Sequence, residues 1–123
     1  MEPKKVMGRL LSVLLALFFV LPNGLGKLVG LMGTDVTQLA QTYGYPVTFM
    51  QLIGALELLG GIGLLLPRTR RWAALGLMGL MLGAIASHIR APETLGMLPL
   101  PIVTLLSLGL VLKWLPNTDE GTA

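Results

Sequence analysis

The run Val47–Leu66 holds twenty residues and only one formally charged side chain, Glu57. Twenty residues of helix extend about 30 Å, which is the thickness of the hydrocarbon core of a bilayer. Glu57 lies near the middle of this run, where an ionised carboxylate that faces lipid is costly. We therefore expect a membrane-spanning helix that turns Glu57 toward protein, water or a ligand.

The composition of the whole chain supports an integral membrane protein. Its 123 residues are 54% hydrophobic and only 12% charged, whereas charged residues make up about 25% of soluble domains. A soluble protein of this size cannot bury so much apolar surface, and we expect one membrane domain over residues 1–123. The absence of cysteine and the single histidine exclude thiolate metal sites and a bis-histidine haem within the chain, and we predict no metal.

Hydropathy divides the chain into four apolar runs and a polar tail. We predict an all-α fold, an antiparallel integral membrane four-helix bundle with helices over about 6–32, 47–66, 72–89 and 95–113 and a tail over 116–123. The basic start and first apolar run also resemble a signal peptide, but no small-residue cleavage site follows cleanly, so a retained span is favoured. Short connections make the last three helices antiparallel neighbours.

Two local features modify this plan. Pro22 should kink or interrupt helix one, because proline lacks the backbone donor and clashes with the preceding turn. The polar stretch 33–46 contains apolar residues at helical spacing over Val36–Tyr43, preceded by the N-cap candidates Thr34 and Asp35. We expect a short interfacial helix there, lying along the membrane surface between helices one and two.

The basic residues predict the orientation. With four spans, seven of the nine basic residues fall on the side of the termini: Lys4, Lys5, Arg9, Arg68, Arg70, Arg71 and Lys113. Only Lys27 and Arg90 fall on the other side. The positive-inside rule then puts both termini in the cytoplasm, as for a protein of a bacterial-type inner membrane. Because the basic residues flank apolar runs, the net charge of +3 does not indicate nucleic acid binding.

Lys27 is the expected partner of Glu57. Asn23 and Lys27 are four residues apart in helix one and share a face if the helix continues past Pro22. Pairing would relieve the cost of both buried charges. Two interpretations remain open: the pair fixes helix one against helix two, or it takes part in ligand or proton handling.

His88 lies near the outer end of the third run. It is either an interfacial histidine that bonds a backbone carbonyl or Glu93, or the third member of a polar ligand-binding pocket with Lys27 and Glu57, where its titration near neutral pH would matter.

Small residues recur at helical spacing in the second and third runs, as in tightly packed membrane helices. They are Gly54 and Gly61 in the second run and Gly76, Gly79 and Gly83 in the third. We expect these stripes to pack helix against helix and to enclose Glu57. The alternative is a groove shaped for a flat ligand or a lipid tail.

An ordered set of motifs resembles the DoxX-like family of small four-helix membrane proteins. The motifs are Gly24–Leu28, Gly54–Gly61, Arg68–Arg71, Ala73–Leu77 and Met81–His88, and the resemblance covers nearly the whole chain. It implies a role beside membrane redox complexes, since some members look like subunits of thiosulfate:quinone oxidoreductases and more distant relatives act in assembly or chaperoning. The chain departs from a thiol-based redox role in having no cysteine.

Two functional hypotheses follow. In the first, the chain is a non-catalytic accessory or assembly subunit of a redox-linked membrane complex, with lipid, membrane proteins and a second copy of itself as candidate partners. In the second, it is a subunit of an oxidoreductase that binds a quinone, a lipid or a small apolar ligand, with Glu57 as proton acceptor. We do not expect it to be an enzyme on its own.

Overall fold

The computed structural model describes residues 2–115, and this part of the chain is helical without a strand. The predicted tail over 116–123 lies outside the described residues. The elements are α1 (Pro3–Phe18), a π-helical segment (Phe19–Leu25), α2 (Gly26–Val29), a 3-10 turn (Leu31–Gly33), α3 (Val36–Tyr43), α4 (Val47–Leu65), α5 (Arg70–Arg90), a 3-10 segment (Pro92–Met97) and α6 (Pro99–Trp114).

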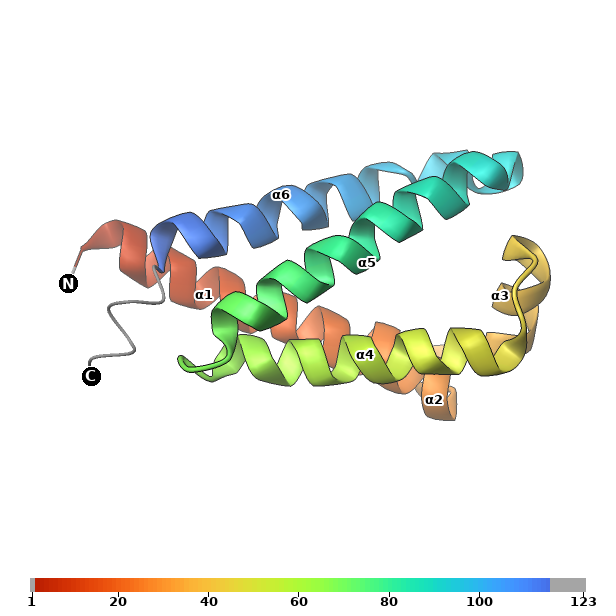
Figure 1. The fold of residues 1–123 in the computed structure, drawn as a ribbon, viewed down its shortest axis with the longest axis horizontal. Helices are drawn as coiled ribbons and strands as arrows, with labels where there is room; N and C mark the ends of the chain where they lie inside the picture. The colour runs from red at the N-terminus through yellow and green to blue at the C-terminus, as the bar shows by residue number, and fades with distance from the viewer. Residues whose placement is uncertain (1, 116–123) are drawn as a thin grey trace.

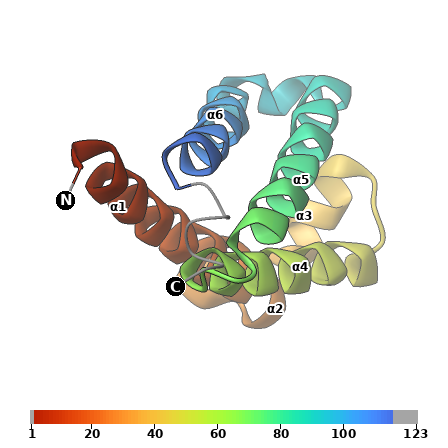
Figure 2. The ribbon, with the colours of Figure 1, turned by 60° about the vertical axis from the view of Figure 1, so that its left-hand side comes forward.

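The four longer helices pack around a common interior. α4 contacts α1 and α5, and α6 contacts the same two helices on the other side, so the order around the interior is α1, α4, α5, α6 (Figure 2). The start of α1, the α4–α5 turn and the end of α6 lie at one end of the molecule (Figure 1). A Cβ atom on Gly8 would lie within 3.0 Å of atoms of Trp114 and Leu115, which confirms that the two ends of the described chain meet.

Three helical segments are long and apolar enough to cross a membrane: Pro3–Val29, Val47–Leu65 and Arg70–Arg90. Large apolar side chains point outward from each of them, as expected for surfaces that face lipid. The predicted four-span bundle is therefore supported in part. The fourth helix, α6, is apolar but has only 16 residues, fewer than the roughly 20 that a bilayer requires.

The start of the fourth helix differs from the prediction. We expected helix from Leu95, but residues 92–97 form a 3-10 segment and α6 begins at Pro99. In an α-helix the carbonyls of Leu95 and Met97 would accept hydrogen bonds from positions 99 and 101. Both positions are proline and have no N–H, so the α-helix cannot extend further back.

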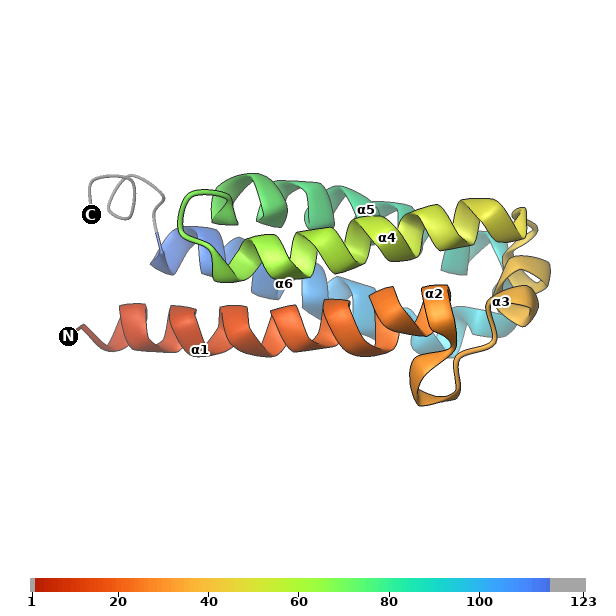
Figure 3. The same cartoon turned by 90° about the horizontal axis from the view of Figure 1, so that it is seen from below.

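Helix one also ends earlier than predicted, at Val29 instead of residue 32. Gly30 adopts a left-handed conformation (φ 75°) and its N–H donates to the carbonyl of Gly26, which is a common way for a helix to end. The disturbance expected at Pro22 takes the form of the π-helical segment, which continues the helix instead of breaking it. This segment carries the chain from α1 into α2 (Figure 3).

The short helix between helices one and two is confirmed at Val36–Tyr43. Its N-cap is Asp35, whose side chain accepts hydrogen bonds from the backbone N–H groups of Thr37 (3.1 Å) and Gln38 (3.2 Å). The helix lies across the end of the molecule opposite the chain ends (Figure 1) and contacts α4, α5 and α2.

The expected packing between the glycines of helices two and three is wrong. A Cβ atom added to Gly76, Gly79 or Gly83 would meet no atom within 4 Å. The glycines of α4 face helix one instead: a Cβ on Gly61 would lie 2.8 Å from Cγ2 of Val20, and one on Gly54 2.7 Å from Cβ of Lys27. The contact between α4 and α5 depends on two other glycines, Gly60 against Leu77 and Gly63 against Ala73.

A cluster of buried apolar side chains fills the half of the interior that lies toward the chain ends. The buried cluster contains Leu15, Ala16, Phe19, Leu64, Ala74, Leu77, Met81, Leu108, Val111 and Leu115. In the other half, toward α3, the residues of α5 and α6 that face the interior include Gly79, Gly83, Ala84 and Thr104. These small side chains leave a cavity in this half, which is the candidate site.

Candidate functional site

The ion pair that the sequence predicts is present. Nζ of Lys27, on α2, lies 2.6 Å from Oε1 of Glu57, near the middle of α4. The Lys27 side chain is 12% exposed and the Glu57 side chain 3%, so both charges are withdrawn from the surroundings. Because each is the nearest opposite charge of the other, the pair lowers the free-energy cost of a carboxylate in the middle of a membrane-length helix.

A close approach of two backbones brings the pair together. An added Cβ on Gly24 would lie 2.9 Å from Cβ of Leu58, and one on Gly54 would lie 2.7 Å from Cβ of Lys27. Side chains at either position would push helix one away from α4. The missing side chain at Gly54 leaves room for the stem of Lys27, whose amine reaches Glu57 one turn further along α4.

The π-helical segment orients the lysine. Pro22 has no N–H, so in an α-helix the carbonyl of Phe18 would lose its donor. The side-chain amide Nδ2 of Asn23 donates to this carbonyl instead, at 3.0 Å. The Oδ1 atom of Asn23 then accepts from Nζ of Lys27 at 3.4 Å. A continuous chain of hydrogen bonds therefore runs from the carbonyl of Phe18 through Asn23 and Lys27 to Glu57.

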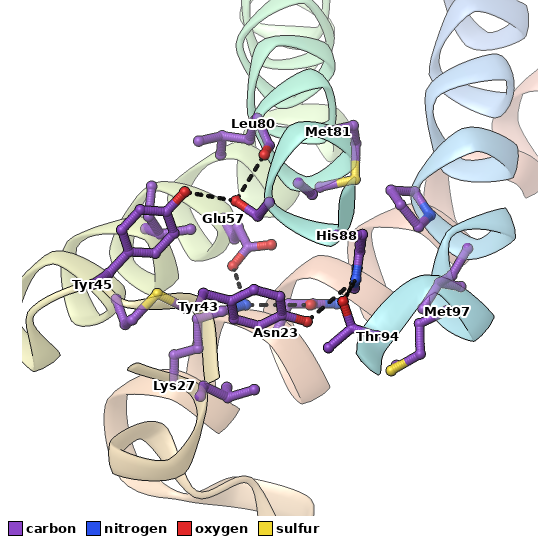
Figure 4. A pocket seen from close by; sticks show the side chains of 18 of the residues that line it. Asn23, Lys27, Tyr43, Tyr45, Glu57, Leu80, Met81, His88, Thr94 and Met97 are labelled. Atoms are coloured by element: carbon purple, nitrogen blue, oxygen red, sulfur yellow. Dashed lines mark hydrogen bonds and ion pairs between the residues drawn. The ribbon is translucent and has the colours of Figure 1, made fainter. Parts of the chain in front are cut away.

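The second carboxylate oxygen of Glu57 has no such partner. Among residues 2–115 the carboxyl group makes hydrogen bonds only through Oε1, with Lys27. Glu57 nevertheless lines the interior cavity. In Figure 4 the Lys27 amine lies below this carboxyl group, and His88 and Thr94 are drawn to its right. A buried carboxylate oxygen is thus available to a molecule in the cavity.

The cavity has a volume of about 660 Å³. It is bounded by the π-helical segment, α2, α3, α4, α5 and α6. All the helices at the end of the molecule where α3 lies therefore contribute to its wall. Most of the lining side chains are apolar, and Phe49, Ile53, Leu80 and Met97 are typical. Asn23, Lys27, Glu57 and His88 all line this one cavity, so the four candidate site residues are brought together.

His88 forms a second polar group on the wall. Its Nδ1 atom lies 2.9 Å from Oγ1 of Thr94 and 3.3 Å from the hydroxyl of Tyr43. The Thr94 hydroxyl donates its proton to the carbonyl of Ala91 at 2.7 Å, so its oxygen must accept from His88. In the neutral ring the proton is therefore on Nδ1 and Nε2 is an acceptor. Among residues 2–115, His88 bonds neither a backbone carbonyl nor Glu93, contrary to the first interpretation above.

A third polar group ties the end of α3 to α5. The Ser87 hydroxyl donates to the carbonyl of Gly83 (2.9 Å), so the hydroxyl of Tyr45 donates to Ser87 (2.8 Å). Arg90 in turn donates to the oxygen of Tyr45 at 3.0 Å and lies over its ring. This chain of contacts holds the segment between α3 and α4 against α5; Figure 4 shows Tyr45 at this place.

Tyr43, Thr94, Tyr45 and Ser87 were not among the predicted site residues. The sequence gives a signal only for the two tyrosines, a residue type that is typical of the membrane–water interface. Gly79 and Gly83, predicted to pack helices, line the cavity instead, while Gly76 does neither. Residues 2–115 contain no group of three His, Cys, Asp or Glu side chains placed to hold a metal.

Fold and site together define an α-helical integral membrane protein with a buried Lys–Glu pair at the wall of an interior cavity. The sequence profile of the DoxX-like family matches residues 10–111. The chain belongs to the DoxX-like family. Neither the curated proteins nor the solved structures contain a match to it.

The ion pair can be tested with a double-mutant cycle in detergent. Lys27→Met should lower the free energy of unfolding by about 3 kcal/mol, because it leaves the Glu57 carboxylate buried without a partner. Glu57→Gln should cost less, since an amide oxygen still accepts from Lys27. The double variant should regain much of the loss, and additive effects of the two substitutions would contradict a direct pair.

The proton position on His88 can be read directly, because the chain has a single histidine. In ¹⁵N-labelled protein at a pH where the ring is neutral, we expect the spectrum of the Nδ1–H tautomer. Thr94→Val, which removes the acceptor, should shift the population toward Nε2–H. A wild-type spectrum dominated by Nε2–H would contradict the hydrogen-bond directions derived above.

Proposed function

We propose that this chain is a membrane-embedded binding protein for a molecule with an apolar body and a small polar head, of the lipid or quinone type. The observation that carries the proposal is the cavity of about 660 Å³ with Lys27 and Glu57 in its wall. In this role the chain acts as a non-catalytic subunit of a membrane complex.

The cavity has the size and chemistry of a small-molecule site. Such sites have volumes of about 300–1,000 Å³ and an apolar lining with a few polar groups that fix the orientation of the ligand. Here the polar groups are Glu57 with Lys27 and Asn23, and His88 with Tyr43. Apolar side chains such as Phe49, Ile53 and Leu80 line the remainder.

The geometry supports a role of the Lys27–Glu57 pair in ligand binding in addition to a structural role. A pair that only fastened two helices would be enclosed by apolar side chains, like the cluster around Phe19 and Leu77. Glu57 instead lines a cavity and keeps one oxygen unbonded among residues 2–115. The role of Glu57 as proton acceptor in an oxidoreductase uses the same geometry and stays a prediction, as do protein partners and a homo-oligomer.

The proposal includes a placement in the membrane. α6 would form a fourth span together with the 3-10 segment before it, and the end that carries the basic residues would face the cytoplasm of a bacterial-type cell. The first two turns of α1, the α4–α5 turn with the first turn of α5, and the last turn of α6 contribute these basic residues to one end of the molecule. α3 and the cavity would then lie toward the outer face.

Cavity-filling substitutions test ligand binding. Ala84 lines the cavity, whereas Ala86, on the same helix, is exposed and does not. We expect protein extracted in mild detergent to carry a lipid or quinone that native mass spectrometry detects. Ala84→Phe should remove most of it and Ala86→Phe should not. Equal retention by both variants, at equal thermal stability, would contradict the proposal.

Cysteine labelling tests the orientation, since the chain has no cysteine of its own. Arg68 and Glu93 are exposed at opposite ends of α5. In a bacterial host, a membrane-impermeant maleimide should label Glu93→Cys in cells with a permeable outer membrane and Arg68→Cys only after the inner membrane is broken. The reverse pattern would show that the termini lie outside the cytoplasm.

A further inference from the structure

We propose that the polar head bound in this cavity is an uncharged hydroxyl group, which donates its proton in a hydrogen bond to Oε2 of Glu57. The inference rests on the proposed function and specifies the ligand class of the same site. It starts from the buried carboxylate oxygen that lines the cavity without a partner among residues 2–115.

The charges on the wall of the cavity disfavour an anionic head beside Glu57. The formally charged side chains on its wall are Lys27, Glu57 and Asp35. The positive charge of Lys27 is taken up by Glu57 at 2.6 Å, and Asp35 adds a negative charge. A carboxylate or phosphate placed beside Glu57 would therefore meet a negative charge, and the one cation among the lining side chains is already paired, which is unfavourable.

Two hydrogen-bond acceptors on the wall, one on Glu57 and one on His88, have no donor among residues 2–115. Oε2 of Glu57 can only accept while the carboxylate is paired with Lys27. The hydrogen bond of His88 with Thr94 leaves a second acceptor on the wall, Nε2 of the neutral ring. Lys27 donates to Glu57 and Asn23 and keeps one N–H. A hydroxyl group satisfies this set, because it donates to the carboxylate and can accept from the ammonium group.

A ligand of the same shape that lacks the hydroxyl proton cannot make the hydrogen bond to Glu57. An ether or a carbonyl group placed against Glu57 would bring an acceptor against an acceptor and would leave the carboxylate oxygen desolvated. Sites built around a hydrogen bond to a ligand hydroxyl discriminate strongly against the analogue that lacks it. The cavity should therefore distinguish a hydroxylated ring from its methyl ether or its oxidised, carbonyl form.

Three probes with one apolar body test this selectivity: para-heptylphenol, its methyl ether para-heptylanisole, and the anion para-heptylbenzoate. Binding is measured by calorimetry at neutral pH with the full chain in nanodiscs, and partition into empty nanodiscs is subtracted. We expect the phenol to bind at least about tenfold more tightly than the ether, and the benzoate to bind more weakly than the phenol.

A single substitution replaces the hydrogen-bond acceptor that faces the polar head of the ligand with a donor. In Glu57→Gln the amide must present its oxygen to Lys27, which has only donors, so its NH₂ group replaces the oxygen Oε2. The preference for phenol over ether should then fall below about threefold. Ala86→Phe, on the exposed face of α5, should keep the wild-type preference.

The outcomes separate this inference from the proposed function. If the ether or the benzoate binds to the wild type as tightly as the phenol, the hydroxyl inference is wrong while the cavity remains a ligand site. If none of the three probes binds above the empty-nanodisc level, the proposed function is wrong and the inference falls with it. The wild-type comparison decides the matter even if Glu57→Gln does not fold.

Discussion

The ion pair between Lys27 and Glu57 is the interaction on which the arrangement of helix one depends. A carboxylate in the middle of a membrane-length helix must find an opposite charge or a polar surrounding. The lysine that supplies it comes from a separate segment, so helix one has to lie against α4 over the length that includes both residues. Gly24 and Gly54 allow this approach, because any side chain at either position would meet the other segment.

The proline in helix one contributes to the same pair. Its missing N–H leaves the carbonyl of Phe18 for the Asn23 amide, and the oxygen of that amide then contacts the lysine. A proline, which in the sequence predicts a break in the helix, is thus accommodated beside a polar network. π-Helical turns are frequent at functional sites, and here the turn sets the direction in which Asn23 and Lys27 project.

The interior is divided between a packed half and a hollow half. Toward the chain ends, Phe19, Leu64, Leu77 and Leu108 are fully buried in a common apolar cluster. Toward α3 the wall that α5 and α6 contribute includes Gly79, Gly83 and Ala84, and a cavity remains there. Packing in the first half can hold the helices in place, while the second half keeps a pocket with the polar groups at its wall. This division is what lets one small chain combine a stable fold with a binding site.

The sequence by itself determined the helical class, the boundaries of α3 and α4 within a residue, and the pairing of Lys27 with Glu57. These follow from apolar run lengths, from the capping residue Asp35, and from the cost of an isolated charge in lipid, all of which act locally or allow one solution. The partners of His88 and the role of the glycines in α5 were decided by the tertiary structure alone. A glycine has the same sequence signature whether it faces a helix, a cavity or lipid. A histidine finds its partner on whichever segment folds beside it, and both outcomes depend on how helices far apart in the chain are rotated against one another.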